Sequence, residues 1–234
     1  MSFFDKIGDK YRSSDTLTRL IMLNCAMFAL VLLTDIILTL FTKSTLTAAT
    51  IFQYQQDPGN LIFRPWTLVT APLTSWGLWH LLFNMLTLYW LGGLFLRRST
   101  SAGMRGLYIL GALAAMVCFT ATNFAPFLRT AQGTMPLASA SILAIGTALA
   151  FQAPDSTEKL PLLGYVKIKW IVIALGLADV ALLPHPSAAM DLAHAGAAAM
   201  GWYYQYRLRQ GSDITAPLNR LYVKFSDLIG KMIK

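Results

Sequence analysis

Three polar residues that could perform nucleophilic chemistry stand inside apolar segments of this chain. They are His80 in HLLFN, Ser139 in LASAS and His194 in AHAGAAAMG. A serine with a histidine in reach is the minimum set for nucleophilic hydrolysis, because the imidazole can take the hydroxyl proton. A polar side chain in hydrocarbon is costly unless it faces a partner or a water-filled cavity. The three residues are therefore the first candidates for a functional site.

The composition indicates that these segments lie in lipid. The chain is 56% hydrophobic and 13% charged, whereas ordinary soluble domains carry about 25% charged residues. Its two cysteines, Cys25 and Cys118, both fall in apolar runs, which favours neither a disulfide framework nor a metal cluster. We therefore expect a polytopic membrane protein without a disulfide framework or a metal cluster.

Apolar runs long enough to cross about 30 Å of hydrocarbon predict an all-α membrane protein with six transmembrane helices. The membrane domain is expected over residues 17–206. The predicted spans are Leu17 to Phe41, Trp76 to Leu96, Gly106 to Pro126, Pro136 to Ala153, Ile168 to Pro184 and Ala188 to Tyr206.

The distribution of positive charge predicts the orientation, because cytoplasmic loops retain Lys and Arg. With six spans, only Lys43, Arg64 and Arg129 of the 19 Lys and Arg fall on the outer side. Both termini are then cytoplasmic, and the net charge of +8 reflects topology and contact with anionic lipid rather than nucleic-acid binding. The short chain without an organellar targeting pattern favours a prokaryotic cytoplasmic (inner) membrane.

Both ends of the chain are expected to lie on the cytoplasmic membrane surface. In residues 207–234, apolar residues from Leu218 to Ile233 recur at three- and four-residue intervals, with Arg220, Lys224 and Lys231 on the intervening face. This pattern is typical of a basic amphipathic helix at an interface, although a solvated charged tail is the simpler alternative. Residues 1–16 form a shorter version of the same pattern.

The three polar residues are expected to share one layer of the membrane. With this topology the second, fourth and sixth helices begin on the outer side, and the depths of His80, Ser139 and His194 differ by less than one helical turn. His80 and Asn84 are four residues apart and share a helix face. Ser139 lies in the first turn of its helix, where its backbone N–H has no intrahelical acceptor and is available to an oxyanion.

These residues carry a resemblance to the rhomboid family of intramembrane serine proteases. HLLFN resembles the H-x-x-x-N of the family's second helix, LASAS its G-x-S motif, and AHAGAAAMG its A-H-x-G-G-x-x-x-G. The resemblance implies a six-helix rhomboid-like bundle in which Ser139 and His194 form a catalytic dyad without a third acidic member. It implies that His80 and Asn84, with Ser139, form the oxyanion hole. It also implies hydrolysis of peptide bonds in or near transmembrane helices of membrane-protein substrates.

Two other functions remain open. Leu137 stands where the family has glycine, which places a branched side chain near the expected path of a substrate and suggests an inactive rhomboid-like protein that binds transmembrane helices. A small transporter that uses Asp35, Asp179 and Asp191 is the second alternative; for Asp35 and Asp179 the simpler expectation is interhelical hydrogen bonding. Asp191 is otherwise expected to cap or gate its helix, and Ser141 to be a packing residue.

Overall fold

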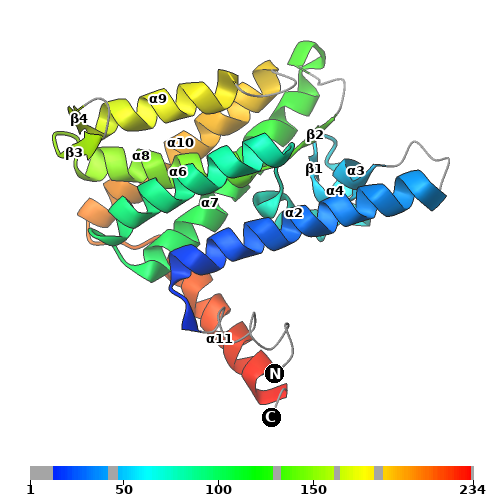
Figure 1. Ribbon diagram of the computed structural model, residues 1–234, viewed down its shortest axis with the longest axis horizontal. Coiled ribbons are helices and arrows are strands. Elements are labelled where there is room, and N and C mark those ends of the chain that lie inside the picture. Colours follow the sequence, from blue (N-terminus) through cyan, green and yellow to red (C-terminus); the bar gives the residue numbers. More distant parts are fainter. Residues whose placement is uncertain (1–12, 42–46, 129–132, 161–163, 182–186, 233–234) are drawn as a thin grey trace.

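Helices make up most of the chain in the computed structural model, which describes residues 13–41, 47–128, 133–160, 164–181 and 187–232 (Figure 1). Each of the six predicted apolar runs contains one long helix. These helices are α2 (Thr16–Phe41), α6 (Leu78–Leu96), α7 (Ser101–Ala121), α8 (Ala138–Gln152), α9 (Ile168–Ala181) and α10 (Ala188–Arg209). Most of the expected amphipathic segment 1–16 lies outside the described residues.

Short elements connect the long helices. Between α2 and α6 the chain forms α3 (Ala48–Phe52), β1 (Tyr54–Gln55), α4 (Gly59–Phe63), α5 (Thr67–Thr70) and the 3-10 helix η1 (Ala71–Leu73). Between α7 and α8 lie η2 (Thr122–Phe124), η3 (Pro126–Leu128) and β2 (Thr134–Met135). β1 pairs antiparallel with β2, with Tyr54 opposite Met135. Between α8 and α9, β3 (Thr157–Leu160) and β4 (Gly164–Lys167) form an antiparallel hairpin.

Helix α11 (Ala216–Met232) forms within the segment predicted as a basic amphipathic tail. It extends away from the body of the molecule at the lower edge of Figure 1. Among its described side chains, Leu221 and Tyr222 are exposed.

The boundaries of α7 differ from the predicted span of Gly106 to Pro126. The helix begins at Ser101, because the side chain of Thr100 accepts the backbone N–H of Gly103 and caps this end. Arg105 therefore lies within the helix and not in the preceding loop. The α-helix ends at Ala121, and the chain continues as 3-10 turns.

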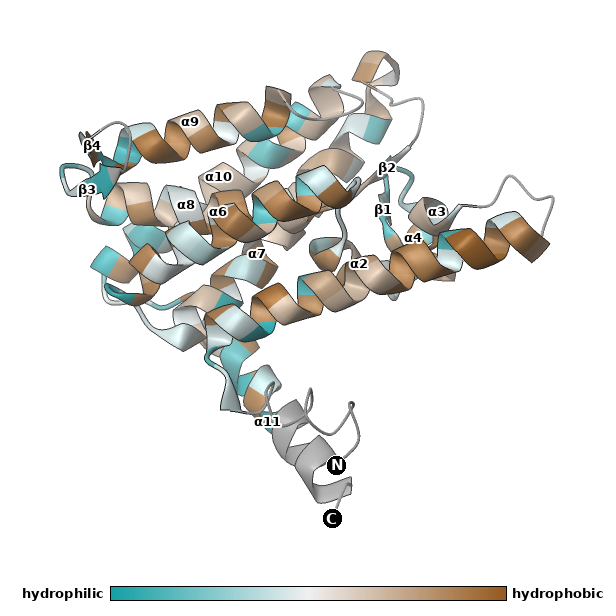
Figure 2. Cartoon of the chain, in the orientation of Figure 1, coloured by the Kyte–Doolittle hydropathy of each residue, from teal (hydrophilic) through white to brown (hydrophobic). Residues whose placement is uncertain are grey.

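Three helical segments are long and apolar enough to cross a membrane, among the described residues: α2, α6 and the stretch of α7 that continues to Phe124. Figure 2 shows hydrophobic residues along most of α2 and α9, and hydrophilic residues near β3 and β4. Helix α8 is apolar but shorter.

The centre of the bundle is formed by α7, α8 and α10, which pack closely against one another. Ala197 and Gly201 on α10 are both buried, and small residues four positions apart let two helices approach closely. A Cβ added at Gly201 would collide with the backbone carbonyl of Ala144 on α8. Small residues thus bring the helix that carries Ser139 against the helix that carries His194.

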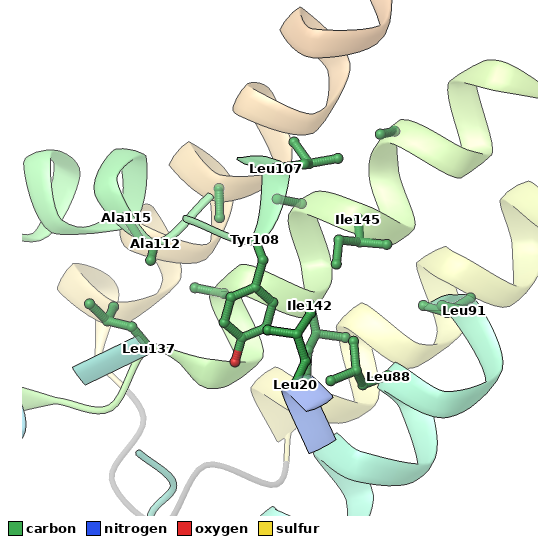
Figure 3. Packing of buried hydrophobic residues seen from close by; sticks show 14 of the residues in the cluster. Leu20, Leu88, Leu91, Leu107, Tyr108, Ala112, Ala115, Leu137, Ile142 and Ile145 are labelled. Carbon is green, nitrogen blue, oxygen red and sulfur yellow. The ribbon is translucent and has the colours of Figure 1, made fainter. Parts of the chain in front are cut away.

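The hydroxyl of Tyr108 on α7 connects the segment after α2 to the central helices by hydrogen bonds. This hydroxyl donates to the carbonyl oxygen of Pro72 at 2.7 Å and accepts from Asn24 Nδ2 on α2 at 3.0 Å. The ring lies within the buried apolar cluster, near Leu20 and Ile142 in Figure 3. The start of α8 is fixed to the same segment, because the N–H of Leu137 donates to Ala71 O at 2.9 Å.

Candidate active site

Ser139 is the second residue of α8 and is buried. At this position of a helix the backbone N–H has no intrahelical acceptor, and the helix dipole favours negative charge nearby. Because α8 begins at Ala138, its free N–H groups and its dipole can stabilise negative charge beside the Ser139 hydroxyl.

Ser139 Oγ lies 3.0 Å from His194 Nε2. The other ring nitrogen, Nδ1, lies 2.8 Å from the carbonyl oxygen of Met190, one turn earlier on α10. Since a carbonyl only accepts hydrogen bonds, we assign the proton of the neutral ring to Nδ1. The lone pair of Nε2 then faces the serine hydroxyl, which is the arrangement that a general base requires.

His80 and Asn84 lie together on the buried face of α6. His80 Nδ1 accepts the backbone N–H of Trp76 at 3.4 Å and lies 3.5 Å from Asn84 Nδ2. The Asn84 amide also donates to Ser75 Oγ at 3.3 Å. Because Nδ1 of His80 is the acceptor, its Nε2 carries the ring proton. His80 therefore has one N–H to donate, as an oxyanion hole needs.

Asp179, a buried residue of α9, contacts both histidines. Its Oδ1 accepts from His80 Nε2 at 3.2 Å, and its Oδ2 lies 3.1 Å from His194 Nε2. Nε2 carries no proton in the neutral ring, so the second contact is an ion pair only when His194 is protonated, and Oδ2 has no hydrogen-bond partner among the described residues. The family resemblance implies no acidic residue at this place. Asp179 faces Nε2, the nitrogen that serves the serine, and not Nδ1, where the acid of a catalytic triad binds.

The expected interhelical hydrogen bond of Asp179 is confirmed by its bond to His80 on α6. The sequence did not identify the partner, because both histidines are distant in the chain and the contact depends on how α9 packs. One signal pointed to it: a carboxylate inside an apolar membrane segment needs a partner.

The other two aspartates of the transporter alternative lie elsewhere. Asp35 Oδ1 accepts the backbone N–H of Ala48 at 2.7 Å, so its bond is to the segment after α2. Asp191 is exposed in the first turn of α10, and Ser187 supplies the capping oxygen through its bond with the N–H of Met190. The capping part of the expectation for Asp191 is therefore wrong, whereas a gating role stays a prediction.

Leu137, which the sequence placed near the expected path of a substrate, lies in the apolar core. Its side chain is fully buried in the apolar cluster shown in Figure 3, which also contains Ala112 and Ala115 of α7. Its φ of −118° is accessible to any residue, so the position requires no glycine. The hydroxyl of Ser141 donates to Leu137 O at 3.1 Å, in agreement with the predicted packing role of this serine.

A small cavity of about 20 Å³ adjoins the site, with room for about one water molecule. Ser139, Asn84 and Asp179 all line it, and its other lining residues come from α6, α8 and α9. A larger apolar cavity of about 360 Å³ lies between α2, α5, α7 and α11 and includes none of the candidate site residues. Ser139 and His194 are only 4% and 2% exposed, so the site is closed in this conformation.

Apolar helices packed around a buried serine and histidine define the class: an integral membrane protein with the groups of a nucleophilic hydrolase. A family model described as the Rhomboid domain matches residues 63–211, which is more than half of the chain. The chain belongs to the rhomboid family, and the resemblance seen in the sequence is confirmed. Comparisons with curated proteins and with solved structures give no match.

Proposed function

We propose that this protein is an intramembrane serine endopeptidase in which Ser139 is the nucleophile and His194 the general base. The observation that carries the proposal is the 3.0 Å separation of Ser139 Oγ from His194 Nε2, with Nδ1 held by Met190 O. Rhomboid family membership supports the same chemistry. The substrates are transmembrane helices of membrane proteins.

The reaction follows from these contacts. Ser139 Oγ attacks the carbonyl carbon of the scissile peptide bond while its proton passes to His194 Nε2. The Nδ1–H bond to Met190 O keeps the ring oriented and disperses charge on the imidazolium. His194 then gives the proton to the leaving amine, and a serine ester remains. A water molecule, deprotonated by His194, hydrolyses this ester and frees Ser139.

Three groups are proposed to stabilise the oxyanion of each tetrahedral intermediate. They are the backbone N–H of Ser139, the Nε2–H of His80 and the side-chain amide of Asn84. Loss of one such donor typically lowers kcat by about 10²- to 10³-fold. None of these steps requires a metal or a cofactor.

We further propose six membrane spans, formed by α2, α6, α7, α8, α9 and α10, in a prokaryotic cytoplasmic membrane. Three apolar segments of sufficient length and the concentration of Lys and Arg at the termini and in alternate loops support this topology. Both termini are cytoplasmic, and Ser139 lies toward the outer side.

A fluorophosphonate probe tests the nucleophile. The purified wild-type protein should be labelled at Ser139, as located by peptide mass spectrometry. Ser139→Ala and His194→Ala should remove labelling. Ser141→Ala is the matched control, because Ser141 is a buried serine on the same helix whose hydroxyl is bonded to Leu137 O. Absence of labelling in the wild type, or equal labelling of Ser139→Ala, would contradict the proposal.

A further inference from the structure

The proposed oxyanion hole is not free to accept a substrate in this conformation. His80 has a single N–H, on Nε2, and that group donates to Asp179 Oδ1. The same carboxylate reaches His194 Nε2 through Oδ2. A carboxylate oxygen bound to His80 resembles the oxyanion that the reaction would place there. Asp179 therefore occupies the acceptor position that the proposed function assigns to the substrate oxyanion.

Helix α9 forms one wall of the site. Asp179 and Ser139 line the same cavity of about 20 Å³, which is too small for a peptide backbone. Entry of a substrate therefore requires a neighbouring helix to move. Among the long helices, α9 packs mainly against α8, and its residues Trp170, Ile173 and Leu177 are exposed. Helix α9 therefore forms the outer wall of this cavity.

The hydrogen bond from His80 Nε2 to Asp179 Oδ1 holds this wall to α6. When His194 on α10 is protonated, its Nε2 also pairs with Asp179 Oδ2, and one carboxylate then joins three helices. Hydrogen bonds to a charged group are stronger than neutral ones, and more so away from water.

We propose that Asp179 is a latch: its carboxylate takes the place of the substrate carbonyl oxygen at His80 and holds α9 over Ser139 until a substrate displaces it. This inference rests on the proposed function. A latch lowers the fraction of molecules able to bind substrate and so raises the apparent KM, without lowering kcat at saturation.

The first test compares cleavage kinetics of wild type and Asp179→Ala in proteoliposomes with a transmembrane substrate. We expect kcat/KM to rise about 10-fold, through a lower KM, as loss of one charge-assisted bond predicts. Asp179→Asn keeps the side-chain shape and should give a smaller rise. Leu177→Ala, on the exposed face of the same helix, is the matched control and should behave as wild type. An unchanged KM, or a fall in kcat, would overturn the latch.

The second test needs no activity and separates the latch from the proposed function. Hydrogen–deuterium exchange is compared for Ser139→Ala and for the double variant Ser139→Ala/Asp179→Ala. The backbone amides of α9 should exchange faster in the double variant, and those of α7 should not. Equal exchange in α9 would overturn the latch even if the wild type proves to be a protease. Faster exchange in α9 with a wild type that neither cleaves nor binds the probe would instead refute the proposed function.

Discussion

At the residue scale, the chemistry depends on which nitrogen of His194 carries the proton. Met190 O fixes the proton on Nδ1, so a backbone carbonyl performs the orienting task that an aspartate performs in a catalytic triad. Among the described residues, the carboxylate that contacts the ring is that of Asp179, and it lies at the other nitrogen. A backbone carbonyl thus orients the proposed base, whereas the carboxylate of Asp179 lies beside the nitrogen that faces the serine.

Leu137 provides a prediction at the same scale, because its side chain is fully buried in the core. Leu137→Ala should lower the free energy of unfolding by about 2–5 kcal/mol through lost burial and a residual cavity. Thermal unfolding in detergent measures this change. Leu137→Gly should likewise create no protease activity that the wild type lacks. Gain of activity in Leu137→Gly would favour the inactive rhomboid-like alternative.

At the element scale, the site exists because α8 and α10 approach closely. Gly201→Ala would place a methyl group against the backbone of Ala144, and the two helices would have to separate. We expect a loss of about 1–3 kcal/mol in stability together with slower labelling of Ser139. Gly93→Ala on α6 is the control, since nothing lies within 4 Å of the added Cβ; it should be neutral or stabilising by about 0.5–1 kcal/mol. Similar behaviour of both variants would contradict the packing account.

The hairpin of β3 and β4 supplies a prediction on pH. Lys167 Nζ donates to Asp155 Oδ1 at 3.0 Å, and this hydrogen bond, with the charges of Lys167 and Lys169, lowers the pKa of the exposed Asp155 carboxyl below its ordinary 3.8. A lowered pKa means that the pair stabilises the fold above pH 3.8 and that this contribution is lost as pH falls through the folded-state value. Asp155→Asn should therefore lower the Tm slightly at pH 7 and leave it unchanged near pH 2. A larger effect at the acidic pH would contradict this assignment.

At the scale of the whole molecule, the sequence predicted the positions of helices and of the polar residues within them. The contacts between different helices are seen only in the structure. The six apolar runs predicted the positions of the long helices, and the motifs predicted which polar residues lie near the starts of α6, α8 and α10. The boundaries of α7 were missed because Thr100 caps the helix earlier than hydropathy suggests. The partners of Asp179 were missed because spacing along a chain does not show which helix packs beside another.

Topology is the prediction that belongs to this scale. A single cysteine placed near residue 13 or near residue 213, in a variant without Cys25 and Cys118, should react with a membrane-impermeant reagent only in inverted vesicles. A cysteine at Asp191, near the start of α10 and exposed, should react from the outer side. Reaction of the two terminal positions from opposite sides would contradict an even number of spans.

Cleavage of a membrane-embedded substrate is the most direct test of the central claim, that Ser139 and His194 form a peptidase centre. A transmembrane substrate, selected by screening segments against the wild type, is reconstituted in proteoliposomes with either wild type or Ser139→Ala, and the products are measured by mass spectrometry. The account predicts two fragments from one peptide bond in or near the transmembrane helix, formed by wild type and not by Ser139→Ala. No cleavage of any segment by wild type, or equal cleavage by Ser139→Ala, would contradict it.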